Sequence, residues 1–223
     1  MKTSTKAMLV VTGALVAAAA ITAAVTISQN NQAIPEAPIN PANNLVAASA
    51  PDSHLLTSPE SSTVTFVEFL DFECESCGAV YPYIEDLRAE FGDRVTFVMR
   101  YFPLPGHVNS TNAAVAVEAA SRQGMLIPMY QRLFEKQAEW GEQQVSRADT
   151  FREYAGQLGL DLAQYDADVA DPSTLERVEA DFAAGLALGV QSTPTMFVND
   201  VPLELRSIDD IRSAIVAALD AEG

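Results

Sequence analysis

The chain has 223 residues, with 13 lysines and arginines against 30 acidic residues, and its formal net charge is −17 at pH 7. An acidic balance of this size argues against nucleic acid as a partner, because phosphate backbones are bound mainly by clustered Lys and Arg. It indicates solubility or a saline habitat, or alternatively a preference for basic protein segments. The two cysteines and two histidines are too few and too scattered for a zinc site, so we expect neither a metal nor a cofactor.

The N-terminal region predicts export. Residues 1–7 include two lysines, and residues 8–27 contain no charged side chain. That apolar length spans a bilayer, and lysines ahead of it keep residues 1–7 in the cytoplasm. We therefore predict a single-pass signal-anchor over 8–27, with everything after it outside the cell membrane. The alternative is a cleaved signal peptide, with cleavage near 18–20 and a secreted product.

Residues 28–62 are rich in Asn, Gln, Pro, Ala and Ser and hold few large apolar side chains. Such a segment buries too little surface to offset the entropy of ordering it. We predict a flexible extracytoplasmic linker, in which His54 is solvated. Residues 63–223 have the size of one globular domain with a hydrophobic core.

The domain opens with a strand and a pair of cysteines. Residues 63–70 are almost continuously apolar apart from Glu68, which predicts a central parallel strand covered on both faces. Cys74 and Cys77, the only cysteines, follow closely. A disulfide between them closes too short a loop to stabilise the fold much, so we interpret the pair as redox-active.

A helix over 74–91 is predicted to begin at the first cysteine. The helix dipole and free N–H groups favour the thiolate of Cys74, which we predict to be the exposed nucleophile. Cys77, one turn later and facing inward, is placed to attack a mixed disulfide. Three nearby acids oppose the dipole by raising the pKa of Cys74: Asp71, Glu73 and Glu75.

The rest of the domain is mainly helical. A strand over 94–102 is followed by a helical stretch over about 109–189, within which Asp171-Pro172 predicts a helix start. The predicted helices are 112–123, 128–138, 146–159 and 172–188. A hairpin over 195–205 turns at Asn199-Asp200, and Pro202 marks an edge strand. A helix over 207–219 ends the domain.

Three ordered segments then support a family resemblance: Glu68-Phe-Leu-Asp-Phe-Glu-Cys74, Arg100-Tyr-Phe-Pro-Leu-Pro-Gly-His107 and Gly189-Val-Gln-Ser-Thr-Pro-Thr-Met-Phe-Val198. Over about 63–219 the sequence resembles the thioredoxin fold. The helical stretch makes it similar to the DsbA-like thiol:disulfide oxidoreductases. The resemblance implies an α/β domain with a central mixed sheet flanked by helices and an inserted helical subdomain at about 109–189.

The resemblance also implies roles for individual residues. Cys74 matches the nucleophile and Cys77 the resolving thiol. Pro194 matches a cis-proline beside the disulfide, and Thr193 would offer its backbone to an extended client strand. Glu68 matches a buried acid that takes the proton from Cys77.

The implied activity is donation of disulfides to reduced client proteins, with reoxidation by a quinone-linked membrane partner. The residues between the thiols, Glu75-Ser76, match neither the Pro-His of strong oxidases nor the Gly-Pro of strong reductases. A reductase or isomerase therefore remains an alternative, as does a redox-inert module that binds extended segments. We interpret His107 as a packing or capping residue, and Trp140, Tyr81 and Tyr83 as core or groove residues.

Overall fold

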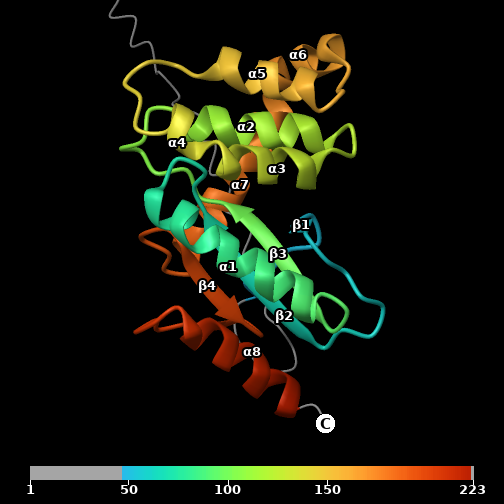
Figure 1. The fold of residues 1–223 in the computed structure, drawn as a ribbon, viewed down its shortest axis with the longest axis vertical. Helices are drawn as coiled ribbons and strands as arrows, with labels where there is room; N and C mark the ends of the chain where they lie inside the picture. The colour runs from blue at the N-terminus through green and yellow to red at the C-terminus, as the bar shows by residue number, and fades with distance from the viewer. Residues whose placement is uncertain (1–46, 222–223) are drawn as a thin grey trace, which may run out of the picture. The chain divides into compact units, whose positions relative to one another are not determined.

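The structure is a computed structural model, and it describes residues 47–221 (Figure 1). A five-stranded sheet has the order β1-β3-β2-β4-β5. Its strands are β1 (His54–Leu55), β2 (Val64–Leu70), β3 (Val95–Tyr101), β4 (Thr195–Val198) and β5 (Val201–Pro202). Only β2 and β3 pair in parallel, and the other pairs are antiparallel, which makes the sheet mixed as predicted.

Strand β2 is the centre of the sheet. Its alternating side chains divide between two hydrophobic clusters, because successive residues of a strand point to opposite faces. Phe66 and Leu70 belong to the larger cluster, and Val67 and Phe69 to the smaller one. The prediction of a central strand buried on both faces is therefore confirmed.

Helices cover both faces. On the larger cluster lie α1 (Glu75–Phe91), which crosses in front of the sheet in Figure 1, and α8 (Asp209–Ala221), which contributes Ile211 and Ile215. The smaller cluster is covered by α7 (Pro172–Ala187), through Phe182. The active-site helix α1 is thus held by the main core of the domain.

The predicted helical stretch between β3 and β4 is confirmed, and all of it except α7, which packs on a face of the sheet, lies at one end of the sheet in Figure 1. It begins with α2 (Ser110–Ser121), α3 (Leu126–Glu135) and α4 (Gln137–Trp140). It continues with α5 (Ala148–Gln157), α6 (Leu162–Ala170) and α7. The sequence did not predict α6 separately.

Local capping explains two of these helix starts. The Asp171 carboxylate accepts the N–H of Ser173 at 2.9 Å, with Pro172 in the first turn, as predicted. Asp161 does the same for α6, because its side chain accepts the N–H groups of Ala163 and Gln164. The missed helix therefore carried a capping signal.

The β4–β5 hairpin also follows local chemistry. Asn199 and Asp200 both have positive φ, 47° and 67°, which suits a two-residue hairpin turn. Strand β5 pairs only with β4 among the described strands, so the edge position predicted from Pro202 is confirmed.

The predicted linker boundary at residue 62 is wrong. Strand β1 pairs with β3, and Leu56 is only 6% exposed. Ala48 is fully buried and donates its N–H to Asp200 at 2.7 Å. His54 is not a solvated linker histidine, because its Nε2 lies 2.6 Å from the Glu118 carboxylate. The part of the predicted linker before residue 47 lies outside the described residues.

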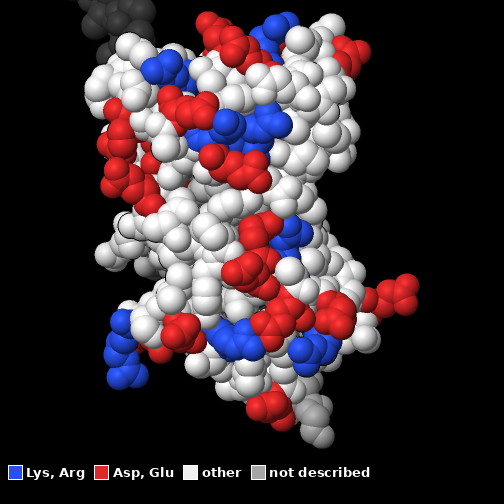
Figure 2. Space-filling view, viewed as in Figure 1, with Lys and Arg blue, Asp and Glu red and all other residues white. Residues whose placement is uncertain are grey.

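Acidic side chains gather in several patches on the face shown in Figure 2, with arginines and lysines interspersed between them. Within residues 47–221, no helix is long and apolar enough to cross a membrane. The predicted anchor at 8–27 lies outside the described residues.

Candidate active site

The two cysteines lie where the central strand passes into α1. Strand β2 ends at Leu70, and α1 begins at Glu75 with Cys74 as its N-cap residue, at φ −65° and ψ 120°. The Cys74 N–H donates to the Asp71 main-chain oxygen at 3.1 Å, which closes the connecting turn. Both cysteines are free thiols in the structure.

The environment of Cys74 favours its thiolate. Its pKa is lowered from 9.0 to about 5, first by a hydrogen bond from the Cys77 thiol. Burial opposes this change, while hydrogen bonds from Thr193 and from the N–H groups of Cys77 and Ser76 reinforce it. These N–H groups belong to the first turn of α1, where the backbone donors of a helix are free. The stabilising donors therefore outweigh the opposing effect of burial on the pKa of Cys74.

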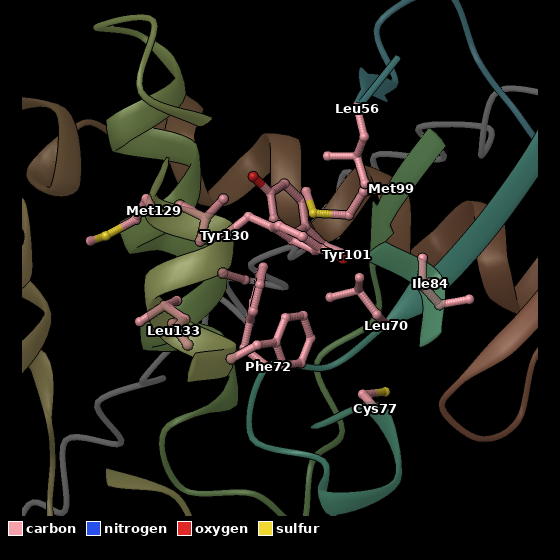
Figure 3. Close-up of a cluster of buried hydrophobic side chains, with 14 of the residues drawn as sticks. Leu56, Leu70, Phe72, Cys77, Ile84, Met99, Tyr101, Met129, Tyr130 and Leu133 are labelled. Carbon is pink, nitrogen blue, oxygen red and sulfur yellow. The ribbon is translucent and has the colours of Figure 1, made fainter. Parts of the chain in front are cut away.

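Cys77 has the opposite character. It is 1% exposed and lies at the edge of the main cluster, near Leu70 and Phe72 in Figure 3. Burial is the first cause that raises its pKa well above 9.0, followed by its hydrogen bond to Cys74 and the charge of Glu68. The pair thus combines an acidic thiol with one that holds its proton.

Cys74 is less exposed than the sequence predicted. Only 7% of its surface is accessible, because the loop before β4 packs against it. The Cys74 thiol donates to the main-chain oxygen of Thr193 at an Sγ–O distance of 3.4 Å. The prediction of an exposed nucleophile is therefore wrong for this dithiol form.

The Thr193–Pro194 peptide bond is cis, as the resemblance implied. Thr193 is 8% exposed, and Pro194 is half-buried beside it. Strand β4 starts at the next residue, Thr195, and pairs with β2. The sheet therefore fixes this loop next to the thiols.

Glu68 is a buried acid in the middle of β2, between Met99 of β3 and Met196 of β4. It is 4% exposed, and its pKa is raised from 4.5 to about 8. Burial is the main cause, and the negative charges of Glu85 and Cys74 add to it. The charge of Glu68 also raises the pKa of Cys77, so the two proton-holding groups interact electrostatically.

A buried aspartate, Asp71, organises the turn. The sequence analysis considered it only as an acid that raises the pKa of Cys74. The Asp71 carboxylate is fully buried and accepts the N–H groups of Glu73 at 2.9 Å and Leu104 at 3.0 Å. Its Oδ2 also lies 2.6 Å from Nδ1 of His107. Burial lowers the pKa of His107, but Asp71, with smaller effects from Cys74 and Glu73, raises it overall. His107 therefore joins the loop after β3 to Asp71 and does more than pack against its neighbours.

A cavity of about 450 Å³ adjoins the start of α1. Its lining residues are Glu73, Glu75, Gln137, Ala138, Gly141, Glu142 and Gln143. Among the described residues, no three His, Cys, Asp or Glu side chains are grouped so that they could hold a metal ion.

The aromatic residues considered from the sequence belong mainly to the core. Trp140 is fully buried, and its Nε1 donates to the Leu133 oxygen at 3.0 Å. Tyr81 stacks on Phe134 with ring centroids 5.0 Å apart. Tyr83 donates its hydroxyl to Asp209 at 3.2 Å.

Comparison with known proteins agrees with this site. A family model described as thioredoxin matches residues 51–217. A thioredoxin-like oxidoreductase from Silicibacter pomeroyi DSS-3 superposes with a TM-score of 0.64 and 25% identity, covering 78% of this chain and 95% of that one. Wolbachia pipientis alpha-DsbA1 superposes with a TM-score of 0.62 and 17% identity, covering 77% and 96%.

A curated relative carries a different name. The Na(+)/H(+) antiporter NhaA of Herminiimonas arsenicoxydans is 37% identical over 171 residues, which are 77% of this chain and 26% of the relative. This chain thus spans about a quarter of that longer protein, to which the antiporter name applies. The fold, the cysteine pair and the family match confirm the resemblance proposed from the sequence. The chain belongs to the thioredoxin family and has the fold of its DsbA-like members.

Proposed function

We propose that this protein is an exported, membrane-tethered thiol:disulfide oxidoreductase that donates its Cys74–Cys77 disulfide to reduced client proteins. The observation that carries the proposal is the lowered pKa of Cys74, about 5, beside a Cys77 whose pKa is raised. A thiol of low pKa is a good leaving group, and stabilising its thiolate favours the reduced form of the pair. A protein that is stable when reduced gives its disulfide away readily.

The exchange proceeds in two steps. A client thiolate attacks Sγ of Cys74, the Cys74–Cys77 bond breaks, and Cys77 leaves as a thiolate that needs a proton. Glu68, with its pKa near 8, is largely protonated at neutral pH and supplies that proton. A second client thiolate then attacks the client sulfur, and Cys74 leaves as a thiolate. The client loses two electrons and two protons overall, and the protein pair gains the electrons.

The client would bind beside the loop before β4. Thr193 and Pro194 lie next to Cys74, and the backbone of Thr193 would pair with an extended client segment once the client displaces its contact with Cys74. Pairing through the main chain tolerates many side chains. This mode suits an enzyme that acts on many reduced proteins rather than on one sequence.

The N-terminal sequence supplies the location. Residues 8–27 would anchor the chain in the membrane, with 1–7 in the cytoplasm and the domain outside, where disulfides persist. A membrane partner linked to quinone would reoxidise the pair. If the segment is instead cleaved as a signal peptide, the domain is secreted with the same chemistry.

Trapping of mixed disulfides tests the proposal. The oxidised parent is mixed with a reduced, unfolded client that has two cysteines, and its oxidation is followed on non-reducing gels. The reduced Cys77→Ser variant is mixed instead with a client that contains a disulfide, so that the Cys74 thiolate attacks one client sulfur and the other leaves as a thiolate. Cys74→Ser should abolish exchange, Cys77→Ser should accumulate the covalent adduct, and the control Ser213→Ala, at an exposed position in α8, should react as the parent does. Absence of an adduct with Cys77→Ser would show that the nucleophile is assigned wrongly.

Two other outcomes would replace the proposal. Faster reduction of a disulfide-containing client than oxidation of a reduced one would identify a reductase or isomerase. Undiminished client folding with a Cys74→Ala, Cys77→Ala protein would identify a redox-inert binding module.

A further inference from the structure

The amide of Gln137 connects the helical insertion to the active-site turn. Its Nε2 donates one hydrogen bond to the main-chain oxygen of Phe72 and another to that of Cys74, both at 2.8 Å. The second acceptor is the carbonyl of the nucleophile itself, which also accepts the N–H of Gly78 at 3.0 Å. More than sixty residues of sequence separate the two sides of this contact.

The helical insertion fixes the position of Gln137. Gln137 is the first residue of α4, and its main-chain oxygen accepts the N–H of Gly141 at 2.7 Å. Trp140, in the same short helix, is fully buried and meets Phe151 edge to face with ring centroids 4.8 Å apart. The position of the Gln137 side chain is therefore set by the core of the insertion, not by the active-site turn alone.

Gly78 leaves the space that Gln137 occupies. A Cβ added at Gly78 would lie 2.7 Å from Cδ and 3.0 Å from Nε2 of Gln137, and closer still to Oε1. Gly78 lies in the first turns of α1, where alanine would favour the helix more than glycine does. The close approach of Gln137 gives a physical reason for glycine directly after the second cysteine.

We propose that Gln137 is a positioning residue, which fixes the backbone of the Cys74 turn so that its thiol stays aligned with the N–H groups of α1 and the thiol of Cys77. The inference rests on the exchange reaction proposed above and names the part of the insertion that supports it. Two hydrogen bonds that fix the carbonyls of residues 72 and 74 restrict the backbone on both sides of the thiol. Without them the turn gains freedom, and the donors around the thiolate lose their alignment.

The test measures ionisation of Cys74 in the full chain from the pH dependence of thiolate ultraviolet absorbance. Gln137→Met keeps the size of the side chain but removes both hydrogen bonds. We expect its acid ionisation constant for Cys74 to fall about tenfold, the effect of roughly one net hydrogen bond. Gln131→Met is the matched control, because Gln131 also joins the insertion to α1, donating to Glu85 at 2.8 Å, away from the turn. It should leave the constant unchanged.

A double-mutant cycle separates positioning from general damage. Gly78→Ala should displace the Gln137 amide and lower the constant as Gln137→Met does. In a Gln137→Ala background the added methyl group has room, so Gly78→Ala should cause no further fall. Additive effects, or an unchanged constant in Gln137→Met, would overturn the inference.

The free energy of unfolding distinguishes a merely structural role. If Gln137→Met lowers stability without changing the ionisation constant, Gln137 does not position the thiol. The parent protein tests the proposed function separately. A parent Cys74 that ionises near 9 would contradict that function, whatever the variants do.

Discussion

The Cys74 thiol and the main-chain oxygen of Thr193 lie 3.4 Å apart, although 119 residues separate them in the sequence. This contact joins the start of α1 to the loop that precedes β4. It covers Cys74 in the dithiol form and places the client-binding loop proposed above against the sulfur of the proposed nucleophile. A change at Thr193 and removal of the Cys77 thiol should therefore change the pKa of Cys74 by different amounts.

Removal of the Cys77 thiol should raise the pKa of Cys74. The hydrogen bond from Cys77 is the largest cause of the lowered pKa, and Thr193 is a smaller one. We expect Cys77→Ala to raise the pKa by about one, and Thr193→Val, which keeps the main-chain oxygen that contacts Cys74, to raise it by less. The pH dependence of alkylation by iodoacetamide measures both. A larger effect of Thr193→Val would contradict the assignment of the main donor.

Cys74 should contribute increasing stability to the reduced protein as pH rises from about 5 to about 9. The folded pKa of Cys74, about 5, lies below its ordinary value of 9.0. A lowered folded pKa contributes stability that is present above the ordinary value and is lost as pH falls through the folded one. The difference in free energy of unfolding between the parent and Cys74→Ser, measured in urea, should grow over this interval. A difference that does not change with pH would rule out a stabilised thiolate.

The contribution of Glu68 to the free energy of unfolding should fall as pH rises, opposite to that of Cys74. Its folded pKa of about 8 exceeds 4.5, so its contribution is present below 4.5 and is lost as pH rises through 8. Glu68→Gln should therefore be more stable relative to the parent at pH 8 than at pH 5. It should also slow attack of a reduced client on the Cys74–Cys77 disulfide about 100-fold, because the group that supplies a proton to the leaving Cys77 thiolate is gone. Unchanged kinetics of this attack would show that Glu68 does not exchange a proton with Cys77.

Asp71 should matter for stability as well as for His107. Asp71→Ala leaves the N–H groups of Glu73 and Leu104 without their acceptor and should lower the free energy of unfolding by about 3 kcal/mol. The pKa of His107 should fall in the same variant, as seen by NMR titration, because Asp71 is what raises it. An unshifted His107 would mean that the pair is not formed in solution.

Residues before 63 should contribute to stability. Leu56 is 6% exposed, whereas its neighbour Leu55 is 45% exposed. We expect Leu56→Ala to cost about 2 to 3 kcal/mol and the matched Leu55→Ala to cost little. Chemical denaturation of the two variants provides the comparison. Equal, negligible costs would restore the flexible linker that the sequence indicated.

Features with a local signal could be predicted from the sequence. The cysteine pair at a helix start, the Asp171-Pro172 cap and the Asn199-Asp200 turn each depend on neighbouring residues, and each is present in the structure. Burial of Glu68 followed from its place in an apolar strand. The larger part of the fold could therefore be inferred from short patterns combined with the family resemblance.

Features that depend on distant contacts could not be predicted. The cover of Cys74 comes from Thr193, and the support of its turn comes from Gln137. Strand β1 has two residues and exists because β3 offers it an edge. No local pattern marks such pairings, since each depends on where the rest of the chain places its partner.

The reduction potential of the Cys74–Cys77 pair, measured in the full chain against defined glutathione ratios, tests the central claim most directly. A thiolate with a pKa of about 5 stabilises the reduced pair and should place the potential near the strong-oxidase end, about −120 mV. A value near about −270 mV would contradict the proposed direction and identify a reductase that needs an electron donor.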